Sequence, residues 1–469
     1  MPPTRYASRP VDPSPLGSPL SLPFSSVVLP NRFMKVAMTE RLATWDPDDM
    51  NVSGIPTQQL LDLYGHWGDG GWGTIVTGNV IVDPTHLEAP GNMILAPSLS
   101  PHSPTKTDPD TDPRFAAYRK LAAAGKRGGS VFLAQLNHPG RQTEFALQEN
   151  PVSASDVQLT KGIGALYAFG KPHPASLDEI AHIKDAFVFA AAYLEKAGFD
   201  GIQLHAAHGY LLAQFLSPTT NLRTDSYGGS LANRARLICE IADGVRSATG
   251  PDFVLAIKIN SVEFQDGGFS AEEAAQLVSL LEAHRFDIVE LSGGTYEEPA
   301  WHHKRESTRR REAFFIEFAE LVIPHVKRAR TFITGGIRTV GAMVDALEKS
   351  GLDGVGLGRP SAAEPRLPIE ILQNGKDGCI KPLVGDTNVL GGEDSWGVGA
   401  SLAGAHMLQM SLNQQPIDSS DQASIDSFLK GFAKWVAAFS TRSKREVLDH
   451  VRIESLESKP YGVVEPSAS

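Results

Sequence analysis

Two histidines and a tyrosine stand close together in the chain, at His205, His208 and Tyr210. They follow the short apolar run 201–204, which is typical of a strand buried on both faces, so we expect them at the C-terminal end of that strand. Two imidazoles at this spacing could bind a metal ion, or they could donate hydrogen bonds to one carbonyl or enolate oxygen. Histidines that only satisfy hydrogen bonds in the core are the third interpretation.

A metal centre at this histidine pair is disfavoured by its sequence surroundings. It would need a third strong ligand and a hydrogen-bond partner for each imidazole, and no His-rich or acidic cluster lies nearby in the sequence. The chain has 2 cysteines, Cys239 and Cys379, without Cys-x-x-Cys spacing. We therefore expect no metal site, no disulfide scaffold and no iron–sulfur cluster supplied by this chain.

Two glycine turns are the second chemical signal. Gly335-Gly336 and Gly358-Arg359 each follow a short apolar run and precede a helical pattern. Backbone N–H groups in such turns can bind a phosphate, and in a barrel of alternating strands and helices this is the usual phosphate position after the last two strands. No Gly-x-Gly-x-x-Gly fingerprint follows the first apolar run, so we expect no separate dinucleotide-binding domain.

The elements that must position these residues alternate along the chain. The candidate strands are the runs 33–38, 74–80, 131–136, 201–204, 254–259, 288–291, 331–334 and 354–357. The candidate helices are the runs 58–70, 114–127, 177–197, 231–249, 271–284, 312–327, 340–349 and 365–373, two of which begin with the predicted capping boxes Ser176/Glu179 and Ser270/Glu273. This alternation predicts an α/β fold, the (β/α)8 TIM barrel. A doubly wound sheet shares the alternation, but the position of the glycine turns favours the barrel.

The flanking segments divide the chain into three parts. Residues 1–20 are rich in Pro and Ser and lack the apolar centre of a signal peptide, which predicts a disordered lead-in. The barrel is expected over residues 21–376, with a hairpin at 20–28 closing its floor. Residues 377–469 form a C-terminal helical extension with one amphipathic helix at 421–439. We expect the extension to pack on the barrel or on the second subunit of a homo-oligomer.

Three loops are expected over the mouth of the barrel. The segments 82–112 and 137–173 are longer than ordinary loops, and such loops inside a compact domain usually carry function. Tyr296 and Trp301 lie after the sixth candidate strand, where they could line a substrate pocket or pack in the core.

Several segments together resemble one family. The run from His205 to Arg234, with Pro30-Asn31-Arg32, Ala37-Met38-Thr39 and Gly356-Leu357-Gly358-Arg359, closely resembles the Old Yellow Enzyme family of FMN oxidoreductases, and the likeness extends over most of the chain. The resemblance implies an NAD(P)H-dependent FMN ene-reductase that reduces the activated C=C bond of an enone, an enal or a nitro compound. It also implies that His205 and His208 bind the activating group and that Tyr210 supplies a proton to the α-carbon. NAD(P)H and the second substrate would share one pocket in turn, by ping-pong kinetics.

The same resemblance implies the cofactor contacts. Ala37, Met38 and Gly78 would approach the flavin ring, Gly78 because it carries no side chain. Thr39 would hydrogen-bond the ring and tune its potential; another branch of the family has cysteine there. Gln135 would bind the pyrimidine edge of the flavin. Lys258 stands where many members have arginine, which keeps the positive charge but loses the planar fork. The phosphate would lie on the backbone of Gly335, Gly336, Gly358 and Arg359.

Composition limits the alternatives. The formal net charge of −11 argues against general affinity for nucleic acid or anionic lipid, and no apolar run reaches the length of a membrane span. The low cysteine content fits a reducing, cytoplasmic location. Two rival functions stay open: a flavin-binding barrel with reduced catalysis, and a related amine- or enoate-oxidising flavoenzyme, although relatives of the second kind carry a cysteine-bound cluster that this chain lacks.

Overall fold

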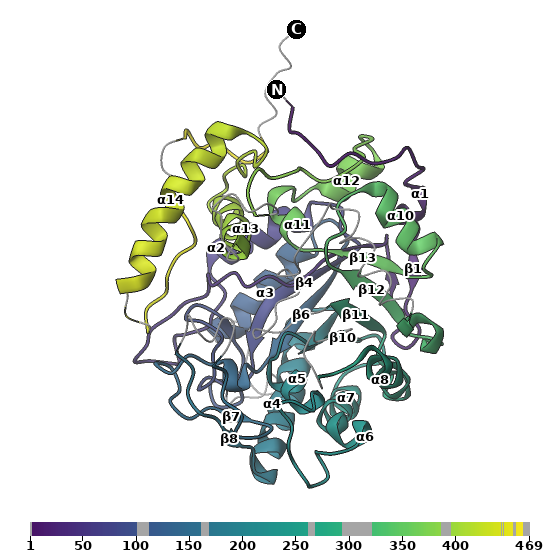
Figure 1. Cartoon of the computed structure of the whole chain (residues 1–469), viewed down its shortest axis with the longest axis vertical. Helices are drawn as coiled ribbons and strands as arrows, with labels where there is room; N and C mark the ends of the chain where they lie inside the picture. The colour runs from purple at the N-terminus through teal and green to yellow at the C-terminus, as the bar shows by residue number, and fades with distance from the viewer. Residues whose placement is uncertain are drawn as a thin grey trace.

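The computed structural model describes residues 2–100, 112–160, 168–260, 268–292, 321–385, 395–441, 443, 445–453 and 456–462. Within these ranges, eight parallel strands close into a barrel (Figure 1). Each strand pairs with its neighbours, and β13 pairs with β3 to complete the circle. The strands are β3 (Phe33–Lys35), β4 (Thr74–Ile81), β6 (Val131–Asn137), β9 (Gly201–Ala206), β10 (Val254–Asn260), β11 (Ile288–Ser292), β12 (Arg330–Thr334) and β13 (Gly354–Leu357). The predicted (β/α)8 barrel is confirmed.

Helices cover the outside of the barrel. They are α2 (Gln58–Gly68), α3 (Pro113–Gly125), α4 (Leu177–Lys196), α6 (Leu231–Arg234), α7 (Arg236–Ala248), α8 (Ala271–Ala283), α10 (Val340–Glu348) and α12 (Leu367–Leu372). The run 231–249 was predicted as one helix, but Ala235 separates α6 from α7. Most of the predicted helix 312–327 lies outside the described residues; 323–325 form a 3-10 turn.

The two predicted capping boxes have different outcomes. At the start of α4, the Ser176 side chain accepts from the Glu179 N–H and the Glu179 carboxylate accepts from the Ser176 N–H, so this box is complete. At the start of α8, the Ser270 hydroxyl accepts from the Glu273 N–H, but the Glu273 carboxylate binds Arg234 instead. A charged partner within reach competes with the exposed backbone N–H that the box would have satisfied.

The floor of the barrel is apolar. The antiparallel pair β1 (Leu20–Ser21) and β2 (Val28–Leu29) closes this end, which confirms the predicted hairpin. Its leucines form a buried cluster with inward-facing strand residues: Leu20, Leu22, Leu29, Met34, Val36, Val76, Val131, Leu133, Val254, Ala256, Ile288 and Phe332. The alternate strand residues, such as Ile257 and Val289, pack outward against the helices. Hydrophobic packing therefore fixes the register, and every second side chain above the floor must face the interior.

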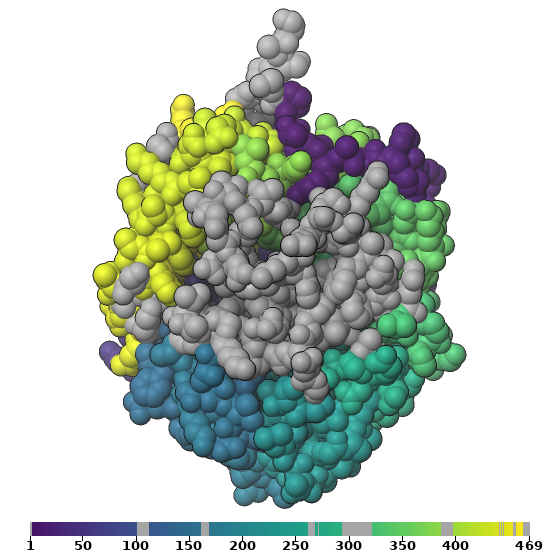
Figure 2. Space-filling model, viewed as in Figure 1, coloured from purple at the N-terminus to yellow at the C-terminus, as the bar shows by residue number. Residues whose placement is uncertain are grey.

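The N-terminal segment is packed on the barrel, which corrects the expected disordered lead-in. It contains α1 (Ser14–Gly17), whose Leu16 is fully buried. Arg5 pairs with Glu364 at 2.6 Å, and Arg9 with Asp345 of α10 at 2.5 Å. Figure 2 shows this purple segment lying against the green C-terminal part of the barrel. Two ion pairs and one buried leucine hold this segment, which its Pro and Ser content alone predicted to be disordered.

The C-terminal extension packs on the barrel and contains two helices, α13 (Ser395–Ser411) and α14 (Gln422–Thr441). Only α14 was predicted. Helix α13 contacts α2 and α11 (Arg359–Ala363), and α14 lies on the outer side (Figure 1). An oligomer formed through this extension stays a prediction. Across the part of the chain that the structure describes, no helix is long and apolar enough to cross a bilayer.

Candidate active site

The two histidines meet at the C-terminal end of β9. His205 lies beside Lys258 of β10 in the parallel register. His208 has a left-handed backbone (φ 58°), followed by Gly209 (φ 76°), and this tight turn brings His208 back beside His205, with ring centroids 5.2 Å apart. The backbone N–H of His208 donates to Asn260 Oδ1 at 3.2 Å, and His208 Nε2 lies 3.0 Å from Ser292 Oγ. A strained conformation held by such contacts is typical of a functional site.

Tyr210 completes the group. It is the N-cap residue of α5 (Leu211–Leu216), and its ring lies 4.6 Å from the ring of His205. The helix begins with the Gln214 N–H donating to the Tyr210 carbonyl at 2.8 Å, and the Leu211 N–H donates outside the helix, to the His138 carbonyl at 2.9 Å. The structure thus brings together the three residues that the sequence singled out.

Both imidazoles are neutral near pH 7. Burial, with Lys258 adding to the effect, lowers the pKa of His208 to about 3. Burial and the neighbouring His208 and Lys258 hold the pKa of His205 well below its usual value. Each neutral ring carries one N–H, and Nδ1 of His205 faces the Ala207 N–H at 3.4 Å, which leaves the proton on Nε2. Two neutral donors near a buried cation suit an oxygen that gains negative charge during a reaction.

A polar layer lies between the apolar floor and the histidines. Lys258 Nζ pairs with Glu290 Oε1 at 2.9 Å. Gln203 Nε2 donates to Glu290 Oε2 at 2.7 Å, and Gln135 Nε2 donates to Gln203 Oε1 at 2.7 Å. Thr334 Oγ1 also donates to Glu290, at 2.7 Å. Gln135 and Lys258, predicted separately as flavin contacts, therefore belong to one network centred on Glu290.

Glu290 was not predicted. It lies in the run 288–291, which was interpreted only as a buried strand. A carboxylate at an inward-facing position of such a strand was the available signal, since a buried charge needs a partner.

The end of β3 carries the next predicted contacts. Ala37, Met38 and Thr39 are half-buried. The Thr39 hydroxyl donates to Glu88 at 2.9 Å and accepts from Asn92 at 3.2 Å, so its proton is already engaged.

The position of Gly78 leaves no room for a side chain. Its N–H donates to Glu40 Oε1 at 2.8 Å, and a side chain at this position would collide with the Glu40 carboxylate and the Met38 carbonyl. The absence of a side chain at Gly78 is therefore required by its protein neighbours, whether or not a cofactor also approaches.

The two glycine turns lie side by side because β12 pairs with β13. Gly335 (φ 144°) and Gly336 (φ 69°) both adopt left-handed backbone after β12. Gly358 begins the turn into α11, where Arg359 is the first residue. A side chain added to Gly399 of α13 would come within 2.8 Å of Arg359 Nη1, so the C-terminal extension packs directly against this arginine.

The residues at the barrel mouth fit a polar cofactor with a phosphate. Among the described residues, Asn260 Nδ2 and both polar side-chain atoms of Asn137 are buried without a hydrogen-bond partner. Orphaned polar atoms at the ends of two strands are most simply explained by a ligand that satisfies them. With the Gln135 amide, the Lys258 cation and two adjacent glycine turns, this donor set fits a flavin mononucleotide. Tyr296 and Trp301 lie outside the described residues.

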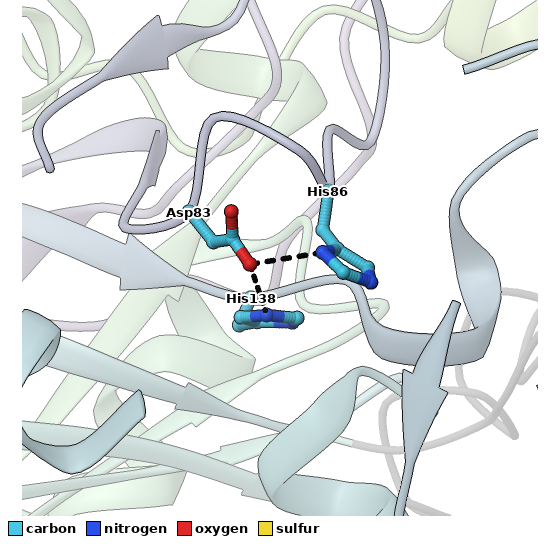
Figure 3. A group of neighbouring side chains, drawn as sticks. All are labelled: Asp83, His86 and His138. Atoms are coloured by element: carbon cyan, nitrogen blue, oxygen red, sulfur yellow. Dashed lines mark hydrogen bonds and ion pairs between the residues drawn. The ribbon is translucent and has the colours of Figure 1, made fainter. Parts of the chain in front are cut away.

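A second histidine cluster joins the loops that follow β4 and β6 (Figure 3). Asp83 Oδ2 lies 2.9 Å from His86 Nδ1 and 3.3 Å from His138 Nε2. The sequence did not predict this cluster, whose ligand atoms lie within 4.8 Å of one another, as in a metal site.

The ring nitrogens that face away from Asp83 determine where each imidazole carries its proton. The Val152 N–H donates to His86 Nε2 at 3.0 Å, and the Gly140 N–H donates to His138 Nδ1 at 3.1 Å. Each neutral ring must therefore carry its proton on the nitrogen that faces Asp83. Burial acts to raise the pKa of Asp83, but the hydrogen bonds from His138 and His86 outweigh it and hold the pKa well below its usual range. We call Asp83, His86 and His138 the histidine clasp, in which each neutral imidazole turns the nitrogen that carries its proton toward the carboxylate.

The chain is similar to known proteins in sequence and in fold. The sequence model of the NADH:flavin oxidoreductase / NADH oxidase family matches residues 16–377. The NADH-dependent flavin oxidoreductase nadA of Aspergillus parasiticus is 42% identical over 446 residues, which are 94% of each chain. The structure of morphinone reductase in complex with tetrahydroNAD is 25% identical with a TM-score of 0.60, covering 78% of this chain and 93% of that one. The Old Yellow Enzyme homologue of Zymomonas mobilis shares the fold at 21% identity, with a TM-score of 0.61 and coverage of 81% and 99%.

Proposed function

The chain belongs to the NADH:flavin oxidoreductase / NADH oxidase family, the family of the Old Yellow Enzymes, and from this premise we propose that it is an FMN-dependent ene-reductase. Membership makes it a flavin-dependent oxidoreductase. The proposed reaction is reduction of the activated C=C bond of an α,β-unsaturated carbonyl or nitro compound with NAD(P)H. The observation that carries the proposal is the meeting of His205, His208 and Tyr210 at the mouth of the barrel.

The histidines act on the activating group. Two neutral imidazoles can donate to the carbonyl or nitro oxygen, which draws electrons from the double bond and makes the β-carbon an acceptor. As the enolate develops, the hydrogen bonds strengthen where charge appears, which lowers the barrier more than it favours substrate binding. Because the pKa of His208 is about 3 and that of His205 is also low, this donor pair does not become a pair of cations at physiological pH.

Tyr210 supplies the proton. Its phenol is a suitable acid for a carbanion-like α-carbon, and its ring packs on His205, which binds the same substrate. When bound, FMN would supply the hydride chemistry by passing two electrons from NAD(P)H to the substrate. Gln135 and Lys258 would hold the flavin ring, and Gly335, Gly336, Gly358 and Arg359 the phosphate.

The reductant and substrate would use one pocket in turn. No second nucleotide-binding domain is expected from the sequence, and the relative in Aspergillus parasiticus is an NADH-dependent enzyme, so NADH is the reductant to test first. We propose small enones and enals as partners and a cytoplasmic location.

One absorbance experiment tests the function. The purified protein is reconstituted with FMN and mixed anaerobically with NADH, then with cyclohexenone. The proposal expects flavin absorbance near 450 nm that bleaches with NADH and returns with the enone. A flavin that is bound and reduced but not reoxidised by enones would leave a flavin-binding barrel without ene-reductase activity. Reoxidation by imines instead of enones would indicate an amine-oxidising relative.

A further inference from the structure

The polar layer of the barrel interior is organised around one carboxylate. Glu290 is fully buried on β11 and accepts from three side chains, Lys258, Gln203 and Thr334. With three donors, both oxygens of this buried carboxylate have partners, and the carboxylate also determines the orientation of the groups that donate to it. None of the steps proposed above uses Glu290.

The carboxylate fixes the direction of a hydrogen-bond relay. An ionised glutamate can only accept, so Gln203 must turn its NH2 group toward Glu290. The Gln203 oxygen then faces Gln135, which must donate its own NH2 group. Gln135 is left with its carbonyl oxygen and the second N–H of its amide to offer to a ligand. The relay therefore fixes the orientation of this amide, so that its oxygen can accept from a ligand N–H.

The same carboxylate balances the only lysine in this layer among the described residues. Lys258 Nζ contacts Glu290 Oε1, and both side chains are buried. The other titratable groups that face Lys258 are His205, its register partner on β9, and His208, and both are neutral near pH 7. Burial lowers the pKa of Lys35 to about 7, and the charge of Lys258 adds to this effect. Without Glu290, a ligand beside Lys258 would meet an uncompensated charge.

We propose that Glu290 is a positioning residue of the cofactor site: it holds and charge-balances Lys258, and it fixes Gln135 as a hydrogen-bond acceptor through Gln203. The inference rests on the proposed function, because it names FMN as the ligand that meets these two groups. It assigns to Glu290 a control over the potential of the bound flavin, since a charge-balanced lysine stabilises the electron-rich reduced form less than a free cation does.

Redox titration of the wild type and four variants tests the charge-balance part. Glu290→Gln should bind reduced FMN about tenfold more tightly relative to oxidised FMN than wild type does, which raises the two-electron midpoint potential by about 30 mV. Lys258→Met should shift the ratio in the opposite direction, and the double variant should return toward wild type. Asp287→Asn is the matched control, because Asp287 precedes the same strand and is equally buried, but pairs with Arg246 at the barrel floor. It should leave the potential unchanged.

The affinity of apoprotein for oxidised FMN tests the relay part. Gln203→Met removes the relay without changing the charge of the site, so it should weaken the binding of oxidised FMN several-fold. The ratio of the affinities for reduced and oxidised FMN, which sets the midpoint potential, should change by less than about threefold. An unaltered FMN affinity in this variant overturns the relay.

The remaining outcomes separate the inference from the function it rests on. Glu290→Gln alone could fail to fold. In that case the double variant, which removes both charges, is compared with Lys258→Met alone. Equal midpoint potentials in these two variants overturn the charge balance. An unshifted or lowered potential in a folded Glu290→Gln also overturns the charge balance. The proposed function survives this outcome if the wild-type flavin still bleaches with NADH and recovers with an enone. A wild type that binds no flavin would overturn both the proposed function and this inference.

Discussion

Tyr210 and His205 lie edge to face, with ring centroids 4.6 Å apart and planes inclined by 70°. They come from different elements: His205 belongs to strand β9, and Tyr210 caps helix α5. The backbone between them contains the left-handed pair His208 and Gly209. Because a strand and a helix fix the two ends of this turn, one side chain can be removed while the others keep their places. The site is therefore suited to tests by single substitutions.

Removal of either histidine should weaken the binding of oxygen anions. His205→Ala or His208→Ala should each cost about 1.5–3 kcal/mol in the binding of a phenol or enone, the usual loss for a hydrogen bond to a charged group. NADH-driven flavin reduction should suffer less, because a nicotinamide makes different demands on the pair. Fluorescence or absorbance titration with a phenol measures the affinity. His182→Ala, an exposed histidine on α4, is the control. Unchanged phenol affinity in both site variants would mean that the pair has a structural role.

The histidine clasp should stabilise the protein without metal. Both imidazoles face Asp83 Oδ2, and in Asp83→Asn an NH2 group at that place could no longer accept from them. If the amide turns its oxygen there instead, the carboxylate charge is still lost. We expect a loss of about 1–3 kcal/mol in the free energy of unfolding. Chemical denaturation measures this loss, and Asp156→Asn, which breaks an exposed pair with Lys171, should cost less than about 1 kcal/mol. EDTA should not change the melting temperature of wild type. A chelator-sensitive melting temperature would restore the metal interpretation.

The barrel was predictable because its strands are short, β-branched and apolar, a pattern that requires burial on both faces. His205, His208 and Tyr210 were predictable as a group for a local reason, since one strand end and one turn hold all three. Lys258 could be identified as a charge inside a buried run. Glu290 is likewise a charge inside a buried run. Its pairing with Lys258 joins two different strands, and it becomes visible only once the register of β10 and β11 is known.

Contacts between distant segments could not be read from the sequence. Asp83 and His138 follow different strands, and only closure of the barrel brings them together. Helix α13 was missed because its glycines suggested a loop. In the structure, Gly399 and Gly404 leave room for Arg359 and His450, so those small residues serve close packing.

The docking of the C-terminal tail should be sensitive to acid through His450. Arg41 Nη2 lies 3.1 Å from His450 Nδ1 and can only donate, so Nε2 carries the proton and donates to the Glu40 carbonyl at 2.7 Å. Burial, with the charge of Arg41 adding to it, lowers the pKa of His450 to about 3. The unfolded chain, with a histidine pKa near 6.5, binds the proton first as pH falls. This contribution to stability is therefore fully present above about pH 6.5 and is lost between there and pH 3.

His450→Gln tests this linkage, because glutamine can still donate to the Glu40 carbonyl but does not titrate. Between pH 7.5 and pH 5, wild type should lose about 2 kcal/mol more free energy of unfolding than the variant. Denaturant titrations at the two pH values give the difference. His205, His208 and His406 also have lowered pKa values, but they contribute equally to both proteins. Parallel pH profiles for wild type and His450→Gln would show that His450 is not part of the acid response.

Substitution of Tyr210 should separate the two half-reactions. Tyr210→Phe removes the phenol proton but keeps the ring against His205, so the histidine pair and the cofactor contacts stay in place. General acid catalysis is worth roughly 10²–10⁴-fold, and enone reduction should slow by a factor in that range. Flavin reduction by NADH needs no such proton and should stay within a few-fold of wild type. Nitro substrates whose product is a stable nitronate should still be reduced, because that anion can leave and take its proton from water. Stopped-flow absorbance follows both phases in the flavin band. Equal slowing of the two phases would mean that Tyr210 only shapes the pocket, and an unaffected oxidative phase with cyclohexenone would place the acid elsewhere.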